Sequence, residues 1–175
     1  MSTETSLDFA TLWSTALDYE TFVAESSKNR GLWEGVYRTA RIPQWAIDEA
    51  RERGKHARLL ALVEDWCGDA SNTVPLLAKL GHLASCLELR VLRRDEHPEV
   101  MDCYLTNGTR SIPIVIALDR DFHPLGHWGP RPHELQAWFL AHRDTMTSAE
   151  RYPEMRKWYA RDRGESTLRE VLELL

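Results

Sequence analysis

The sequence predicts an α/β fold in which a mixed central sheet is flanked by helices. Two continuous apolar runs, Leu59–Val63 and Ile112–Leu118, are typical of strands that are buried on both faces. The segment Leu87–Val91 alternates apolar and charged residues, as a half-buried strand does. Elsewhere, apolar residues recur at three- and four-residue steps, and this spacing predicts helices.

The chain has 175 residues, 43% of them hydrophobic, which is enough for one domain with a sizeable core. Its formal net charge is −5 with both signs mixed along the chain, which excludes a general nucleic-acid binder with a basic face. The apolar runs are too short to cross a bilayer, and residues 1–5 lack the features of a secretory signal. We therefore expect a cytoplasmic protein that binds neither nucleic acid nor membrane, with its oligomeric state left open.

The first 57 residues predict a helical N-terminal extension. Seven apolar residues with helical spacing place one helix at about residues 8–25, and a shorter stripe at residues 32–37 indicates a second helix. Pro43 suits the first turn of a third helix, and Gly54 suits its end. The tryptophans on these stripes are costly to leave exposed, so the extension should pack against the core.

Residues 58–143 predict the core of the fold. Its expected elements are, in order, a strand at residues 59–63, a helix at 67–80 that Gly81 ends, a strand at 87–91, a short helix from Pro98, a strand at 112–118, a strand at 122–127 and a helix at 132–143. The first two strands should be parallel because a helix joins them, and the last two should form a hairpin. Two further helical pieces at residues 144–175 complete a single domain over residues 1–175.

Cys67 is the residue that carries chemistry, because it is expected at the N-terminus of a helix that follows a buried strand. Unpaired backbone amides and the helix dipole favour a thiolate at such a position, so we expect a modestly lowered pKa. The other charges expected nearby have mixed effects: Glu64, Asp65 and Asp69 raise the pKa, whereas Arg110 and Arg131 lower it. Asp69 has a second interpretation as an acid that favours the first helical turn.

Several motifs follow one another in a specific order. They are Trp66-Cys67-Gly68, Pro75 eight residues after the cysteine, Arg94-Asp95, Met101-Asp102, Leu105-Thr-Asn-Gly108, Ile112-Pro113 and Trp128-Gly-Pro-Arg-Pro132 with its Gly129. Over residues 58–143, Trp66-Cys67-Gly68, Pro75, Ile112-Pro113 and Gly129 resemble the thioredoxin family. The full set of motifs, together with the flanking helices, is similar to a bacterial subgroup of thioredoxin-like proteins with helical additions. The resemblance implies a thioredoxin-like fold and a cis Ile112–Pro113 bond that lies against the reactive cysteine and receives the substrate chain.

The sequence departs from that family at the position of its second cysteine, which is Ala70. A dithiol releases its mixed disulfide by intramolecular attack, and Ala70 cannot do this. The buried acid that often assists the second cysteine in the family also falls on an apolar residue, Ala61. Both departures indicate a site with a single cysteine.

The resemblance therefore implies a thiol–disulfide oxidoreductase with one nucleophile. Cys67 would form mixed disulfides with a partner protein or a low-molecular-weight thiol, and a second thiol would release it. Trp66 would shield the site, and the amides of Gly68 and Asp69 would stabilise the thiolate. The alternatives are a redox-inactive protein-binding module that uses the groove beside Pro113, and a bridging iron–sulfur cluster held through Cys67.

The remaining cysteines are interpreted singly, since three are too few for a disulfide scaffold. Cys86 is predicted to be structural, and Cys103 to be either a core filler or, as a minority interpretation, a resolving thiol for Cys67. No Cys/His spacing supports a metal, because His123 and His127 stand too far apart on a strand. No Gly-rich phosphate loop follows a predicted strand, so neither a metal nor an organic cofactor is expected.

Overall fold

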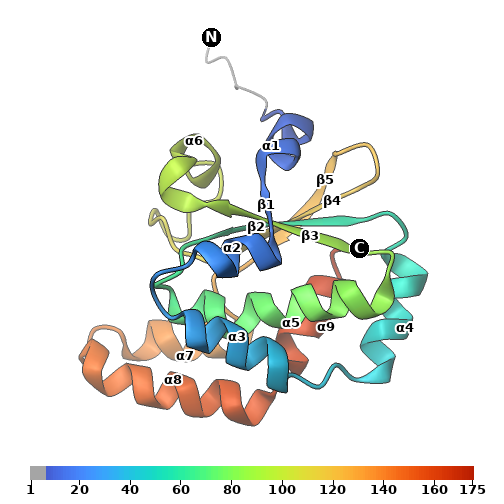
Figure 1. Ribbon diagram of the computed structural model, residues 1–175. Coiled ribbons are helices and arrows are strands. Elements are labelled where there is room, and N and C mark those ends of the chain that lie inside the picture. Colours follow the sequence, from blue (N-terminus) through green and yellow to red (C-terminus); the bar gives the residue numbers. More distant parts are fainter. Residues whose placement is uncertain (1–6) are drawn as a thin grey trace.

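The computed structural model describes residues 7–175 and places a five-stranded mixed sheet at the centre of the fold (Figure 1). The prediction about a secretory signal falls on residues outside this range. The strands are β1 (Leu17–Asp18), β2 (Arg58–Val63), β3 (Glu88–Arg93), β4 (Ile114–Leu118) and β5 (Pro124–Trp128). Their order across the sheet is β1-β3-β2-β4-β5.

The strand directions are those that the connections predict. β2 and β3 are parallel, while β4 is antiparallel to both β2 and β5. Every residue of β4 is buried, as are five of the six in β2, because helices and loops cover both faces of these central strands. The two continuous apolar runs are therefore confirmed as buried strands.

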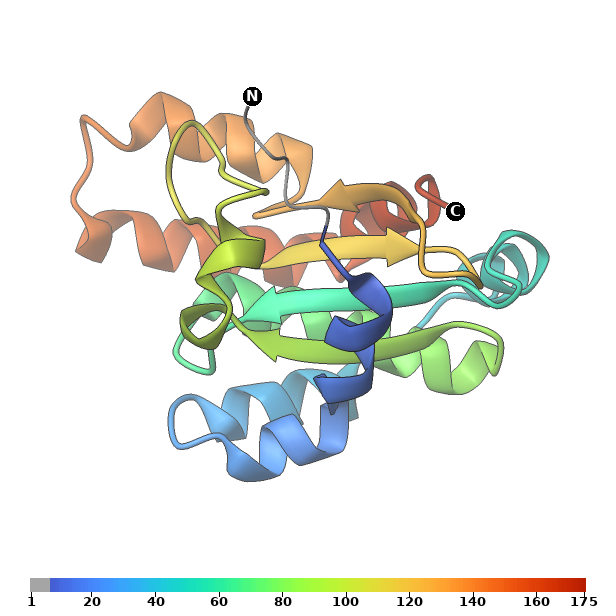
Figure 2. The same ribbon diagram turned by 90° about the horizontal axis from the view of Figure 1, so that it is seen from above.

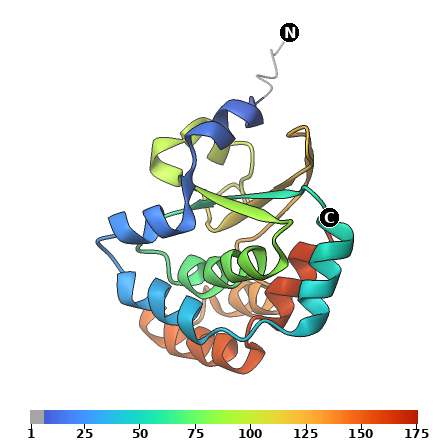
Figure 3. The same ribbon diagram turned by 45° about the vertical axis from the view of Figure 1, so that its right-hand side comes forward.

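The helices lie mostly on one side of the sheet. They are α1 (Phe9–Thr15), α2 (Tyr19–Glu25), α3 (Arg30–Thr39), α4 (Gln44–Arg53), α5 (Gly68–Ala84), α6 (Pro98–Met101), α7 (His133–His142), α8 (Ser148–Asp162) and α9 (Glu165–Leu172), with a short 3-10 turn η1 (Arg94–Glu96). Figures 1 and 3 show α1 and α6 above the sheet and α3, α4, α5, α7, α8 and α9 below it. Within residues 7–175, no helix is both long and apolar enough to cross a membrane.

The single helix predicted at residues 8–25 is wrong, because the chain forms α1, β1 and α2 there. Ala16 is extended, and Leu17 then pairs with Val91 on the edge of β3. The carboxylate of Asp18 accepts a hydrogen bond from the Thr21 amide at 2.7 Å, which caps α2 and favours a new helix start over a continuous helix. The apolar stripe still faces the core from both helices.

Gly81 does not end the helix that follows Cys67, as the sequence suggests, since α5 continues to Ala84. A Cβ atom on Gly81 would lie 2.6 Å from the carbonyl oxygen of Leu87. This glycine therefore permits a close approach between α5 and the segment that enters β3, rather than a helix terminus.

Both extensions share the core of the sheet. Trp33 from the N-terminal extension and Leu168, Val171 and Leu172 from α9 are fully buried in the same apolar cluster as β2 and β4. Figure 2 shows α2 and α3 on the β3 side of the sheet, with α7 and α8 on the β5 side. The two extensions thus flank the end of β2 from which the chain enters α5.

Candidate functional site

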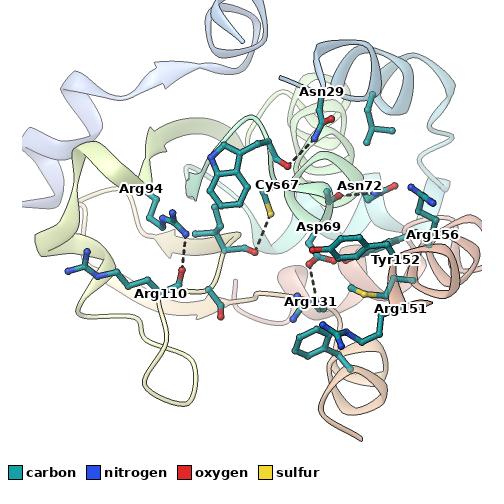
Figure 4. A pocket seen from close by; sticks show the side chains of 18 residues that line it. Asn29, Cys67, Asp69, Asn72, Arg94, Arg110, Arg131, Arg151, Tyr152 and Arg156 are labelled. Carbon is teal, nitrogen blue, oxygen red and sulfur yellow. Dashed lines mark hydrogen bonds and ion pairs between the residues drawn. The ribbon is translucent and has the colours of Figure 1, made fainter. Parts of the chain in front are cut away.

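Cys67 caps the N-terminus of α5, directly after the loop that leaves β2. Its Sγ accepts a hydrogen bond from the Ala70 amide and donates one to the Ile112 carbonyl oxygen, each at 3.5 Å. Figure 4 shows the sulfur between the start of α5 and the segment that precedes β4. The side chain is only 6% exposed, and that exposure faces a pocket.

The backbone opposite Cys67 contains two cis peptide bonds, Ile112–Pro113 and Gly129–Pro130. Gly129 has a φ of +124°, and a Cβ atom there would lie 2.1 Å from the carbonyl oxygen of Pro113. Only a glycine allows this contact, so Gly129 brings the end of β5 against the segment that faces the cysteine.

Burial raises the pKa of the Cys67 thiol to about 11. The amide of Ala70, the amide of Asp69 and the guanidinium of Arg131 lower this pKa, whereas the carboxylate of Asp69 raises it further. The expectation of a modestly lowered pKa is therefore wrong. The thiolate loses its hydration when it is enclosed, and this loss outweighs the favourable end of the helix.

Among residues 7–175, Asp69 is the one acid whose charge raises the pKa of the Cys67 thiol. Its carboxylate lies 2.9 Å from the Arg131 guanidinium and accepts a hydrogen bond from the Tyr159 hydroxyl at 2.7 Å. Burial raises the pKa of Asp69, while Arg131 and Tyr159 lower it. Through this ion pair and this hydrogen bond, Asp69 connects the first turn of α5 to the segment after β5 and to α8.

Glu64 and Asp65 do not crowd the cysteine as the sequence suggests. Glu64 accepts a hydrogen bond from the Asp95 amide at 2.8 Å, and Asp65 accepts from the amides of Ser27 and Lys28 at 2.9 Å. Both carboxylates therefore anchor loops, and neither contributes to the shifted pKa of Cys67.

Trp66 forms part of the pocket wall and is 48% exposed. The guanidinium of Arg94 lies 5.1 Å from the centre of its ring, and the side-chain amide of Asn29 donates to its carbonyl oxygen at 3.0 Å. Residues near the start of α3 and within η1 thus hold the tryptophan in place. The shielding role of Trp66 stays a prediction.

A pocket of about 490 Å³ opens beside Cys67 (Figure 4). Gly68, Asp69 and Ile112 line it with Cys67 and Trp66, whereas Ala70 is fully buried and Pro113 does not line it. The lining includes five arginines and one carboxylate, that of Asp69. The arginines are Arg94, Arg110, Arg131, Arg151 and Arg156.

The other residues that the sequence brings into question do not act on the Cys67 sulfur. Cys103 is exposed and does not line the pocket, so its interpretation as a core filler is wrong. Cys86 is half-buried and packs against the core, in agreement with a structural role. Arg110 forms a two-pronged ion pair with Asp102 at 2.7 and 2.8 Å instead of facing the sulfur. Residues 7–175 contain no cluster of His, Cys, Asp or Glu that could hold a metal ion.

Sequence reasoning missed the contribution of α8. Tyr152, Met155, Arg156 and Tyr159 all line the pocket from this helix. Their spacing of three and four residues places them on one helix face. That spacing could have identified the face, but nothing local to α8 shows that it lies against Cys67.

A family model described as Thioredoxin matches residues 16–152. The chain belongs to the thioredoxin family. Its fold is accordingly thioredoxin-like, with a mixed five-stranded sheet flanked by helices. The motifs from Trp66-Cys67-Gly68 to Ile112-Pro113 thus identified the right family.

Two solved structures resemble this thioredoxin family member over almost its whole length. One is a protein of unknown function from Pseudomonas aeruginosa, with 20% identity, a TM-score of 0.75 and 96% of each chain covered. The other is an HIV epitope-scaffold, with 19% identity, a TM-score of 0.75, and 96% of this chain and 97% of that chain covered. At these identities the likeness shows the fold alone. A comparison with curated proteins finds no significant match.

Proposed function

We propose that the protein performs thiol–disulfide exchange with Cys67 as its single nucleophile. The observation that carries the proposal is the position of the sulfur at the amino end of α5, beside the Ile112 carbonyl and open to a pocket. Membership of the thioredoxin family supports the same chemistry.

The exchange takes place in two steps. The Cys67 sulfur attacks one sulfur of a disulfide R–S–S–R, the Cys67–S–S–R bond forms, and R–S⁻ leaves and takes up the proton that Cys67 loses. A second thiol from solution then attacks the mixed disulfide and releases Cys67. Because Ala70 has no sulfur and Cys103 does not line the pocket, that thiol comes from outside the chain. A reducing compartment such as the cytoplasm would supply it.

The raised pKa limits the fraction of Cys67 that is present as the attacking thiolate. With a pKa of about 11, only about one Cys67 in ten thousand is a thiolate at pH 7. The rate should therefore rise about tenfold for each pH unit between pH 7 and pH 10. A bound partner that supplies positive charge or polar contacts to the sulfur would accelerate the reaction at neutral pH.

Replacement of Cys67 by serine tests the proposal. In a chain that carries Cys86→Ser and Cys103→Ser, so that the exposed Cys103 gives no adduct, we expect the further change Cys67→Ser to abolish mixed-disulfide formation with hydroxyethyl disulfide, measured by intact mass. The serine variant should keep its thermal midpoint within a few degrees, so loss of folding would not account for the result. Equal labelling of the chains with and without Cys67, both carrying Cys86→Ser and Cys103→Ser, would overturn the proposal.

A second candidate function is a redox-inactive binding module, which the buried thiol and its raised pKa favour. In that case the pocket beside Trp66 would recognise a partner without covalent chemistry. The two functions differ in one measurement. Exchange predicts adducts at Cys67 that increase with pH, whereas the binding module predicts an unmodified Cys67 from pH 7 to pH 10.

A further inference from the structure

We propose that the pocket beside Cys67 selects low-molecular-weight disulfides that carry carboxylates. This inference rests on the proposed exchange at Cys67 and names its substrate class. It is drawn from the arginines of the pocket, from the way they are paired, and from the size of the pocket.

Three of the five lining arginines are already paired with carboxylates. Arg131 pairs with Asp69, while Arg94 and Arg110 pair with acids that stand outside the lining, Asp95 and Asp102. These ion pairs hold guanidinium groups around the opening. After these three ion pairs are counted, the net charge of the groups around the pocket is still positive.

The other two arginines, both on α8, supply that charge. Within residues 7–175, neither Arg151 nor Arg156 forms an ion pair with a carboxylate. Arg151 donates to the backbone carbonyls of Arg143 and Met146 and, at 3.3 Å, to the Ser148 hydroxyl, while its Nε is buried without an acceptor among the described residues. Arg156 is exposed at the pocket wall. Guanidinium groups in this state bind carboxylates well, since they offer paired N–H donors in a fork.

The size of the pocket favours a small molecule over a folded partner. A volume of about 490 Å³ lies within the usual range of roughly 300–1,000 Å³ for small-molecule sites. Trp66, Phe139 and Tyr152 provide apolar contact for the body of a ligand. Cys67 is only 6% exposed, so a slender disulfide reaches its sulfur more readily than a disulfide set within a folded chain.

The reaction is the exchange described above, with an anionic R group. The Cys67–S–S–R bond forms as the S–S bond of the small disulfide breaks, and R–SH leaves with the proton from Cys67. A second thiol from solution, R′–SH, then attacks the mixed disulfide, so that the Cys67 thiol is restored and R–S–S–R′ is released. Arginine contacts to the carboxylates would hold the disulfide near the sulfur in both steps.

Three disulfides of similar length but different charge test the inference. They are dithiodipropionate, which is a dianion, hydroxyethyl disulfide, which is neutral, and cystamine, which is a dication. The rate of adduct formation at Cys67 is measured by intact mass in a chain with Cys86→Ser and Cys103→Ser, and is divided by the rate for the same chain unfolded in urea. We expect the normalised rate of the dianion to exceed that of the neutral disulfide by about tenfold, with cystamine slowest.

Arginine variants show whether the pocket causes the preference. Arg151→Gln combined with Arg156→Gln should reduce the dianion-to-neutral ratio to about one. Arg156→Gln alone, at an exposed side chain, should reduce the ratio severalfold without any effect on folding. The matched control is Arg161→Gln, an exposed position on α8 outside the pocket, which should preserve the ratio.

The outcomes separate the two proposals. If none of the disulfides forms an adduct at Cys67 up to pH 10, the proposed exchange itself is wrong. If all three react at equal normalised rates, or if the double arginine variant keeps the preference, exchange stands and the substrate class is wrong. A disulfide-linked acidic decapeptide that reacts faster than dithiodipropionate would also overturn the small-molecule class.

Discussion

At the scale of single residues, the sulfur of Cys67 is subject to opposing influences. The start of α5 and Arg131 stabilise a thiolate there, while burial and the carboxylate of Asp69 destabilise it and raise its pKa to about 11. A helix N-terminus can be recognised in a sequence, because it depends on neighbouring residues. The degree of burial cannot, because it depends on segments that fold over the site.

Replacing Asp69 by asparagine should make Cys67 more reactive. The change removes the charge that raises the pKa of Cys67 and leaves the guanidinium of Arg131 free to act on the sulfur, while the side chain keeps its shape and can still accept from Tyr159. We expect iodoacetamide to alkylate Cys67 about tenfold faster at pH 7, with the midpoint of the pH profile lowered.

The control for this variant is Asp102→Asn, which frees Arg110 at the pocket without removing a group that acts on the Cys67 pKa. It should leave the alkylation profile unchanged. A profile for Asp69→Asn that coincides with that of the natural chain, or shifts to higher pH, would contradict the electrostatic account of the site.

At the scale of elements, the apolar stripe of residues 8–25 predicts one helix, yet the chain divides there into α1, β1 and α2. The stripe indicates correctly which side chains are buried. It does not reveal that the edge of β3 can pair with Leu17 and Asp18, because that edge exists only after the sheet has formed. Asp18 is the local residue that favours the break, since its carboxylate caps α2.

The cap at Asp18 can be tested by its pH dependence. The Thr21 amide lowers the pKa of Asp18, so the cap contributes stability above the ordinary pKa of the carboxyl group, and this contribution is lost as the pH falls through the lowered value. Asp18→Ala should reduce the free energy of unfolding by about 1 kcal/mol at pH 7. In urea titrations this deficit should shrink towards pH 2.

Asp18→Asn provides the matched comparison, since asparagine caps helices about as well as aspartate without a charge. It should keep most of the stability at pH 7 and show no loss on acidification at this position. An Asp18→Ala deficit that is the same at pH 2 and pH 7 would show that the carboxylate does not act as the cap.

At the scale of the whole molecule, the helical extensions belong to the same packed unit as the thioredoxin-like core. Leu168 in α9 lies in one apolar cluster with the central strands, and Trp33 enters it from the other extension. Asn29 and Tyr159 reach the site from the two extensions. The chain should therefore unfold as one cooperative domain over its described length.

Leu168→Ala tests this cooperativity. The side chain is fully buried, so its truncation should reduce the free energy of unfolding of the entire domain by about 2–5 kcal/mol. Far-UV circular dichroism and tryptophan fluorescence should show a single, coincident transition. Leu125→Ala is the control, because Leu125 is 48% exposed and its loss should cost less than about 0.5 kcal/mol. Two separate transitions in the Leu168→Ala chain would show that α9 folds apart from the core.

The amino-acid sequence determined the buried strands, the helix that Cys67 caps and the family, because apolar periodicity and short motifs are properties of neighbouring residues. Only the tertiary structure decided that Cys67 is enclosed, that Glu64 and Asp65 point to other partners, and that the arginines of α8 line its pocket. Asp69 and Tyr159, which meet at the site, are 90 residues apart in the chain. Burial and ion pairing of this kind depend on contacts between such distant segments, and no local pattern encodes them.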